Sequence, residues 1–165
     1  MNIELIEVEE ADKSVLRQLV ELYNYDFSEY DQADVNAHGL YGYTYLDHYW
    51  TEKSRHPFFI KVDGELAGFV LVSDYCYVLK DAGANSIAEF FVMRKYRRRG
   101  VGRIVACEIF AKFPGKWEVL QCRTNIPSIR FWEKIVGEYA DGRFERHDAL
   151  TEDWRGQALV FDNSG

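Results

Sequence analysis

A strand-like segment, a basic turn with two glycines and an apolar helix-like segment follow one another directly between residues 86 and 112. Residues 86–93 have the apolar content of a buried strand, on Ile87, Phe90, Phe91 and Val92. Residues 100–112 place apolar side chains on one helical face, and Phe113-Pro114-Gly115 ends the predicted helix. A strand that leads straight into a helix favours a fold in which helices pack on a sheet.

The remainder of the chain also alternates strand and helix patterns. Strands are predicted at 3–8, 57–62, 67–73, 117–122, around 138–146 and at 157–161, and helices from an Asp12 N-cap to about residue 23, near 46–55 and at 127–136. Asp63-Gly64-Glu65 is a hairpin signal, and Gly137 suits the C-cap of the last helix. This order predicts an α/β (α+β) fold, a mixed sheet with helices on both faces.

The 165 residues have the length of one domain and contain no repeat or linker, so we expect a single domain over residues 1–165. Three widely spaced cysteines exclude a disulfide framework and a Cys-x-x-Cys site, which favours a reducing, cytoplasmic compartment. The first residues lack the pattern of a signal peptide, and no apolar run approaches the ~18 residues of a membrane span. The four histidines show no pairing that indicates a metal site.

Charge is distributed unevenly along the chain. Residues 94–103 hold six basic residues and no acid, whereas residues 21–52 hold seven acids and no Lys or Arg. One segment therefore suits an anion and the other a cation. The net charge of −7 argues against nucleic acid and anionic membranes as partners.

The basic turn is a candidate phosphate site. The N-terminus of a helix presents unpaired N–H groups and a partial positive charge, and the arginines add forked donors. Gly100 and Gly102 remove side chains that would obstruct a phosphate. The spacing fits neither a Walker loop nor a dinucleotide fingerprint, which needs a glycine where Val105 stands. The alternative is a solvated basic turn that caps a helix.

Two spaced motifs resemble the GCN5-related N-acetyltransferase (GNAT) family. The family signature [Q/R]-x-x-G-x-[G/A] is matched by Arg97, Gly100 and Gly102, with Phe91-Val92 before it. A second signature, an Asn after the next strand and then a helix with an aromatic pair, is matched by residues 125–134. The order of predicted elements agrees with the family over nearly the whole chain.

This resemblance implies a mostly antiparallel sheet whose central strands splay apart around acetyl-CoA. Phe91 and Val92 would then face the pantetheine arm and thioester, while Asn125 and Trp132 would line its other side. The pyrophosphate would lie on the turn, at Arg97, Arg98, Arg99, Gly100, Val101, Gly102 and Arg103. Asn125 can act as a helix cap at the same time.

One position departs from the family pattern. Many members have a tyrosine seven residues after the Asn, proposed to protonate the departing CoA thiolate. This chain has Trp132 there, and an indole N–H does not titrate usefully. We therefore expect Trp132 to act by packing.

Acetylation of an amine requires removal of a proton, because a free alkyl ammonium has a pKa of about 10.4. Glu89, on the strand that leads to Val92, is the candidate base; the alternative is an ordinary charged strand residue. The family builds its acceptor site after the first helix, here residues 23–59, which are rich in aromatics and acids. Our candidate acceptor residues are Tyr25, Asp26, Tyr30 and Tyr43. Aromatic faces and acids suit a cationic amine, although such rings also occur in cores and dimer surfaces.

The sequence thus predicts an acetyl-CoA-dependent N-acetyltransferase, an acyltransferase that acts on a primary amine of a small molecule or peptide, with acetyl-CoA (coenzyme A) as co-substrate and no metal. A CoA-binding sensor or structural module without catalysis remains an alternative, as does RNA binding through residues 94–103. The specific amine and a homodimeric state are left open.

Overall fold

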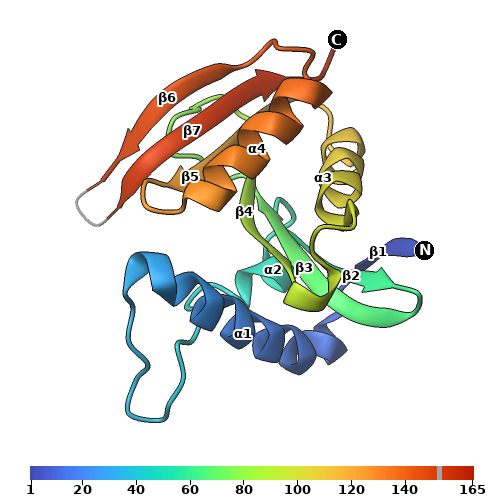
Figure 1. Cartoon of the computed structure of the whole chain (residues 1–165), viewed down its shortest axis with the longest axis vertical. Coiled ribbons are helices and arrows are strands. Elements are labelled where there is room, and N and C mark those ends of the chain that lie inside the picture. Colours follow the sequence, from blue (N-terminus) through green and yellow to red (C-terminus); the bar gives the residue numbers. More distant parts are fainter. Residues whose placement is uncertain (152–153) are drawn as a thin grey trace.

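The computed structural model describes residues 1–151 and 154–165, which contain a seven-stranded open sheet (Figure 1). Its order is β1-β2-β3-β4-β5-β7-β6, and every neighbouring pair is antiparallel except β4–β5. The strands are β1 Ile3–Glu7, β2 His56–Val62, β3 Glu65–Ser73, β4 Asn85–Val92, β5 Lys116–Cys122, β6 Glu145–Leu150 and β7 Arg155–Asp162. Asp63 and Gly64, both at positive φ, form the predicted β2–β3 hairpin turn.

Helices cover both faces of the sheet, as the sequence predicts (Figure 1). They are α1 Lys13–Asp31, α2 His48–Thr51, α3 Val101–Lys112 and α4 Ile126–Tyr139, with short 3-10 turns at η1 Glu10–Asp12 and η2 Arg94–Tyr96. Helices α1 and α2 pack on one face through Leu16, Leu19 and Tyr49. Helices α3 and α4 pack on the other around the buried Phe110 and Trp117. No helix among the described residues is long and apolar enough to span a membrane.

The two central strands separate after a short contact. Strand β4 pairs with β5 only from Asn85 to Ile87, against Trp117 to Val119. Beyond Ile87, β4 continues to pair with β3, while β5 continues to pair with β7. The sheet therefore divides into two halves, and a cleft opens between the carboxyl ends of β4 and β5.

A β-bulge in β4 determines which way its side chains point. Leu71 of β3 lies opposite Glu89, whereas Val72 lies opposite Ile87, so Ala88 is an extra residue. Ile87 accordingly packs with the α3–α4 side of the sheet, and Phe91 with the α1 side. In a regular strand, Ile87 and Phe91 would face the same side.

Helix α1 is eight residues longer than predicted, and α2 is shorter. The apolar face of α1 continues past Tyr23 through Phe27 and Tyr30. The Phe27 ring contacts the Tyr23 ring on one side and the Tyr30 ring on the other. The helix ends at Gln32, which adopts a left-handed conformation with φ 58°. Asp12 occupies the predicted N-cap position, but its side chain makes no capping hydrogen bond.

The predicted strand at 138–146 is wrong over most of its length, and so is the predicted C-cap at Gly137. Helix α4 continues through Gly137 to Tyr139, because the Tyr139 ring packs on Phe110 and Phe161. The chain then turns at Asp141, and β6 starts only at Glu145.

Candidate active site

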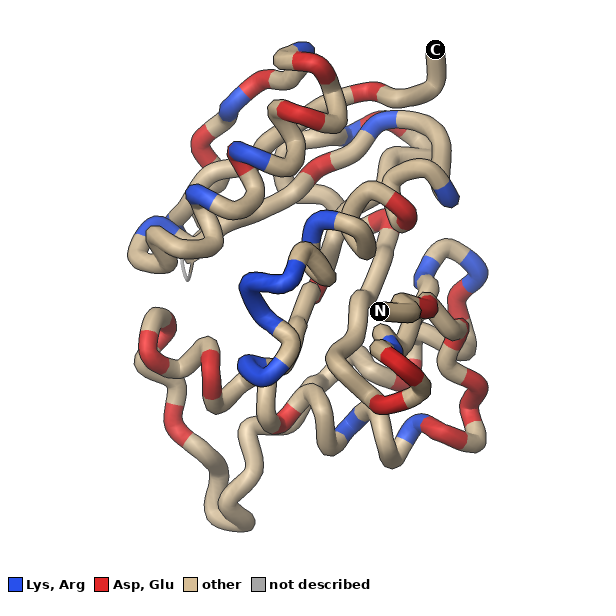
Figure 2. Tube along the Cα trace, turned by 45° about the vertical axis from the view of Figure 1, so that its right-hand side comes forward, with Lys and Arg blue, Asp and Glu red and all other residues tan. Residues whose placement is uncertain are grey.

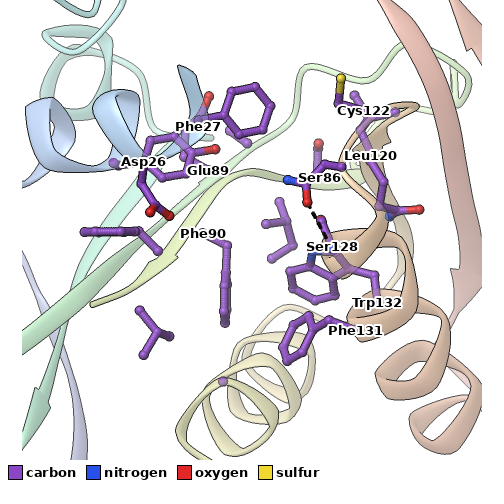
Figure 3. A pocket seen from close by; sticks show the side chains of 18 of the residues that line it. Asp26, Phe27, Ser86, Glu89, Phe90, Leu120, Cys122, Ser128, Phe131 and Trp132 are labelled. Atoms are coloured by element: carbon purple, nitrogen blue, oxygen red, sulfur yellow. Dashed lines mark hydrogen bonds between the residues drawn. The ribbon is translucent and has the colours of Figure 1, made fainter. Parts of the chain in front are cut away.

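A cleft of about 1430 Å³ lies where β4 and β5 separate. Glu89 and Phe90 reach it from β4, Leu120 and Cys122 from β5, and Ser128, Phe131 and Trp132 from α4 (Figure 3). Helix α1 adds Asp26 and Phe27. The cleft therefore runs between the two halves of the sheet, with the basic turn at one margin.

The basic turn has the backbone of an anion cradle. Arg98 and Gly100 both adopt left-handed conformations, with φ of 62° and 81°. This conformation is unfavourable for an arginine, and such strain is concentrated at functional sites. The first helical hydrogen bond of α3 runs from the Ile104 N–H to the Gly100 carbonyl, 3.1 Å away. The N–H groups of Val101, Gly102 and Arg103 therefore have no partner within the helix.

The two glycines of the turn have different roles. A side chain on Gly100 would meet open space, so the positive φ explains the glycine. A Cβ on Gly102 would lie 3.0 Å from the Phe131 ring. Gly102 therefore allows the start of α3 to approach α4, which closes this end of the cleft.

Two arginines of the turn, Arg94 and Arg97, form hydrogen bonds with Asp26 of α1. Arg97 donates from Nε to the Val92 carbonyl and from Nη2 to Asp26, both at 2.7 Å, and Arg94 donates to Asp26 at 2.8 Å. Burial tends to raise the pKa of Asp26, but hydrogen bonds and charge from Arg97 and Arg94 outweigh it and lower the pKa overall. Figure 2 shows the basic run of residues 94–103 as a group of blue segments in the middle of the molecule.

The first turn of α4 forms the opposite margin. The Asn125 side chain accepts a hydrogen bond from the Ser128 N–H at 3.1 Å, so it caps the helix, and it also lines the cleft. Trp132 is only 5% exposed and packs edge-on against Phe90 and Phe131, each at a centroid distance of 4.9 Å. Trp132 therefore packs within the protein, and its contact with a bound cofactor stays a prediction.

Glu89 lines the cleft, close to the Tyr23 side chain of α1 and the Tyr43 side chain of the 32–47 loop. Burial raises its pKa to about 7, while hydrogen bonding from the Tyr23 and Tyr43 hydroxyls opposes this rise. Burial and then the nearby Glu89 raise the pKa of both tyrosines, so these hydroxyls stay protonated as donors. A carboxyl with a pKa near neutrality can accept a proton from an amine.

Three of the four predicted acceptor residues line the cleft, and Tyr25 does not. Tyr30 and Tyr43 line the cleft. Asp26 also lines it, but Arg94 and Arg97 hold both of its carboxylate oxygens. Tyr25 is 68% exposed and lies outside the cleft lining. Among the predicted cofactor residues, Arg99 also lies outside the lining and Val101 is buried in the core.

Several acidic residues of segment 21–52 form hydrogen bonds or ion pairs within the chain. Glu21 accepts hydrogen bonds from the Tyr41 and Gly42 N–H groups, at 2.8 and 2.7 Å, and so fixes the loop that carries Tyr43. Asp47 pairs with Lys13 at 2.8 Å, and Glu52 pairs with Arg55. The charge pattern predicted a cationic ligand, but much of this charge is already engaged within the chain.

Sequence reasoning missed one group of aromatic residues in the cleft. Tyr75 and Tyr77, from the loop between β3 and β4, and Trp154, before β7, contribute to the lining. Two tyrosines so close together between two apolar strands were the available signal. Among the described residues, no group of three or more His, Cys, Asp or Glu side chains is placed to hold a metal ion.

The comparisons with known proteins identify the family and the fold of this chain. The sequence model described as the acetyltransferase (GNAT) family matches residues 16–137. The chain belongs to the GNAT acetyltransferase family. This confirms the family that the motifs at Arg97–Gly102 and Asn125–Trp132 indicated. In the comparison with curated proteins, none matches.

Solved GNAT structures share the fold of this GNAT domain. The aminoglycoside acetyltransferase AAC(6')-Ib in complex with coenzyme A is 17% identical, with a TM-score of 0.70 over 98% of this chain and 95% of that chain. The spermidine N-acetyltransferase of Vibrio cholerae, in complex with CoA and spermine, is 11% identical, with a TM-score of 0.65 over 98% and 96%. An acetyltransferase of Thermus thermophilus is 15% identical, with a TM-score of 0.69 over 98% and 97%. The predicted splayed, mostly antiparallel sheet is thereby confirmed.

Proposed function

We propose that this protein is an acetyl-CoA-dependent N-acetyltransferase that acts on a primary amine of a small molecule or peptide. The observation that carries the proposal is the position of Glu89, a carboxyl with a pKa of about 7, in the same cleft as the basic turn. Membership of the GNAT family supports acetyl transfer.

The residues of the cleft fit acetyl-CoA. The N–H groups at the start of α3, which have no partner within the helix, suit the pyrophosphate together with the Arg98 side chain. Arg103 also lines the cleft, but its Nε donates to Glu138 at 3.0 Å. The edge of β4 beyond Ile87 has no pairing with β5, which leaves backbone groups for the pantetheine arm, whereas the Val92 carbonyl accepts a hydrogen bond from Arg97. Bound acetyl-CoA supplies the acetyl group as a thioester. Trp132 and Phe131 supply an apolar wall from α4.

The chemistry required of the protein is removal of a proton from the acceptor. An alkyl ammonium with a pKa of about 10.4 is not nucleophilic until it loses a proton. The Glu89 carboxylate accepts that proton, and the Tyr23 and Tyr43 hydroxyls orient it. Trp132 offers no titratable proton at the position where other family members have a tyrosine.

The acceptor we propose is a small amine that carries positive charge. Aromatic rings of Tyr30, Tyr43, Tyr45, Tyr75 and Tyr77 line the cleft, and aromatic faces attract cations. Two of the structurally similar proteins were crystallised with cationic amines, kanamycin in one case and spermine in the other. Most of the acids predicted for this role are engaged elsewhere, so the aromatic rings are the main support.

The test is thiol release from acetyl-CoA with a panel of polyamines, aminoglycosides, amino acids and peptides. Steady thiol release that depends on one class of amine supports the proposal. If acetyl-CoA raises the melting temperature but no amine yields thiol, the chain is a CoA-binding module without catalysis. Preference for a neutral or acidic acceptor would contradict the cationic-amine assignment.

A further inference from the structure

Glu118, in the middle of β5, is a fully buried carboxylate that the proposed chemistry does not use. Its side chain is 0% exposed. Oε2 accepts a hydrogen bond from the Tyr77 N–H at 2.7 Å, and Oε1 accepts from the N–H groups of Val78 at 2.7 Å and Leu79 at 3.0 Å. Within the described part of the chain, no Lys or Arg forms an ion pair with it. Three backbone amides therefore compensate its burial.

Burying a carboxylate costs free energy, so a buried Glu indicates that its hydrogen bonds have a structural use. A buried carboxylate loses its hydration, whereas an apolar residue at the same place in β5 would not. Replacing it with an apolar residue would leave three amide groups of the 74–84 loop without partners. Glu118 thus fixes the conformation of this loop rather than the strand that carries it. Burial and the Glu118 charge also raise the pKa of Cys76 to about 12, which keeps that thiol protonated.

The fixed segment carries aromatic side chains of the cleft. Tyr75 and Tyr77 line the cleft although they are 60% and 41% exposed, so the chain displays two large rings to solvent at this place. Their rings meet at a centroid distance of 5.4 Å, and Tyr77 stacks on Trp154 at 6.2 Å. Apart from Glu118, the loop has an ion pair between Asp81 and Lys116, near its other end.

The 74–84 loop that carries these rings joins Ser73 at the end of β3 to Asn85 at the start of β4, whereas the basic turn follows Val92 at the other end of β4, with Glu89 between them. The charge of Glu89 and the hydroxyl of Tyr45 both contribute to the raised pKa of Tyr77, after burial and Tyr75. The loop consequently borders the part of the cleft where the acceptor amine meets its base.

We infer that Glu118 is a positioning residue for the acceptor: it holds Tyr75 and Tyr77 as one wall of the acceptor site, through the amides of residues 77–79. This inference rests on the proposed acetyltransferase function. It predicts that the hydrogen bonds between Glu118 and the amides of residues 77–79 affect recognition of the amine and not binding of acetyl-CoA.

The experiment compares wild type with Glu118→Gln, Glu118→Ala, Tyr77→Ala and the Glu118→Ala/Tyr77→Ala double variant. Glu118→Gln keeps the volume and one acceptor oxygen, which protects against a variant that fails to fold. Ile60→Ala is the matched control, because Ile60 is fully buried in β2 and outside the cleft lining. Each protein is tested with acetyl-CoA and with the most active of spermidine, kanamycin and a lysine-containing peptide.

Two readouts are measured. Amide hydrogen exchange at residues 77–79 should speed up in both Glu118 variants and stay unchanged in Ile60→Ala. The KM of the amine should rise about tenfold or more in Glu118→Ala, equivalent to ~1.4 kcal/mol, and less in Glu118→Gln. The KM of acetyl-CoA should change by less than about twofold. Because Glu118 acts through the loop, the double variant should be little worse than Tyr77→Ala alone.

The possible failures are distinct. If the amine KM is unchanged in Glu118→Ala, or if acetyl-CoA and amine KM rise together, the positioning role is wrong although the enzyme is an acetyltransferase. If wild type acetylates none of the amines, the proposed function fails and the positioning role fails with it, whatever the exchange data show. A rise in amine KM for Ile60→Ala would attribute the effect to general destabilisation and also overturn the inference.

Discussion

At the scale of single residues, Glu89 combines a cost to stability with the catalytic role that we propose for it. Its pKa of about 7 in the folded protein exceeds the ordinary value, so the folded state favours the protonated form. Stability from this group is present at pH below about 4.5 and is lost as the pH rises through about 7. Glu89→Gln, which is always neutral, should therefore raise the melting temperature at pH 8 and change it little at pH 4.

The same substitution should remove the base. We expect Glu89→Gln to lower kcat/KM for the amine by about 100-fold or more at pH 8, with unchanged affinity for acetyl-CoA. In wild type, kcat/KM should rise with pH through about 7 as the Glu89 carboxyl loses its proton. Tyr43→Phe removes a hydroxyl that lowers this pKa, so the rise should move to higher pH. Thiol-release assays across about pH 5–9, a range around that pKa, measure the pH dependence of kcat/KM in wild type and in Tyr43→Phe. A Glu89→Gln enzyme with full activity at pH 8 would exclude the base.

Trp132 offers a second test at this scale. The ring is buried against Phe90, Phe131 and Phe110, and it borders the cleft. Trp132→Phe keeps most of this contact and should cost less than about tenfold in turnover. Trp132→Ala should destabilise the fold by about 3–5 kcal/mol and weaken acetyl-CoA binding. A loss of about 100-fold in kcat for Trp132→Phe, with acetyl-CoA affinity unchanged, would instead indicate a chemical role.

Sequence reasoning about individual residues succeeded where local geometry decides the outcome. Asn125 caps the helix that follows it, which is an effect of neighbouring residues. For Gly100 the sequence predicted room for a phosphate, whereas the structure shows a glycine at a positive φ. Sequence reasoning did not succeed for Asp26, whose partners Arg94 and Arg97 lie some seventy positions away. Glu118 was missed because nothing nearby in sequence shows that it reaches the 74–84 loop.

At the scale of elements, periodicity predicted every helix and strand in the right order but not all their ends. Helix α4 passes through Gly137 because Tyr139 has rings to pack on, and that contact outweighs the helix-breaking tendency of one glycine. The bulge at Ala88 is also invisible to periodicity, yet it decides that Glu89 shares the α1 side of the sheet. Contacts between distant segments set both features.

A substitution at Gly137 tests where helix α4 ends. Gly137 lies inside α4, and an added Cβ would meet only the Phe144 ring, at an ordinary contact distance of 3.6 Å. Gly137→Ala should therefore stabilise the protein by about 0.5–1 kcal/mol, measured by urea unfolding. Acetyl-CoA affinity should not change, since Gly137 lies outside the cleft lining. Destabilisation by this substitution would mean that α4 ends at Gly137, as the sequence suggested.

At the scale of the whole molecule, the cleft results from the limited contact between two halves of one sheet. Three residues of β4 pair with β5, and α3 and α4 pack across the junction. The family resemblance predicted this splay. It did not predict that the cleft would be lined by residues from α1, two loops and the segment before β7, because those segments meet only in the folded chain.

A ligand that contacts both halves should stabilise the whole fold. Acetyl-CoA at ~100 times its dissociation constant should add ~2.7 kcal/mol to the free energy of unfolding, measured as a shift in melting temperature. The shift should shrink as salt rises, because charges of the turn at residues 94–103 contribute to binding. Gly102→Val should abolish the shift while the protein stays folded, since the Cβ of residue 102 would meet Phe131 and force the start of α3 away from α4. Glu89→Gln should keep it, because the carboxyl acts on the amine. Wild-type protein that shows no shift with saturating acetyl-CoA would disprove the assignment of the turn as its phosphate site.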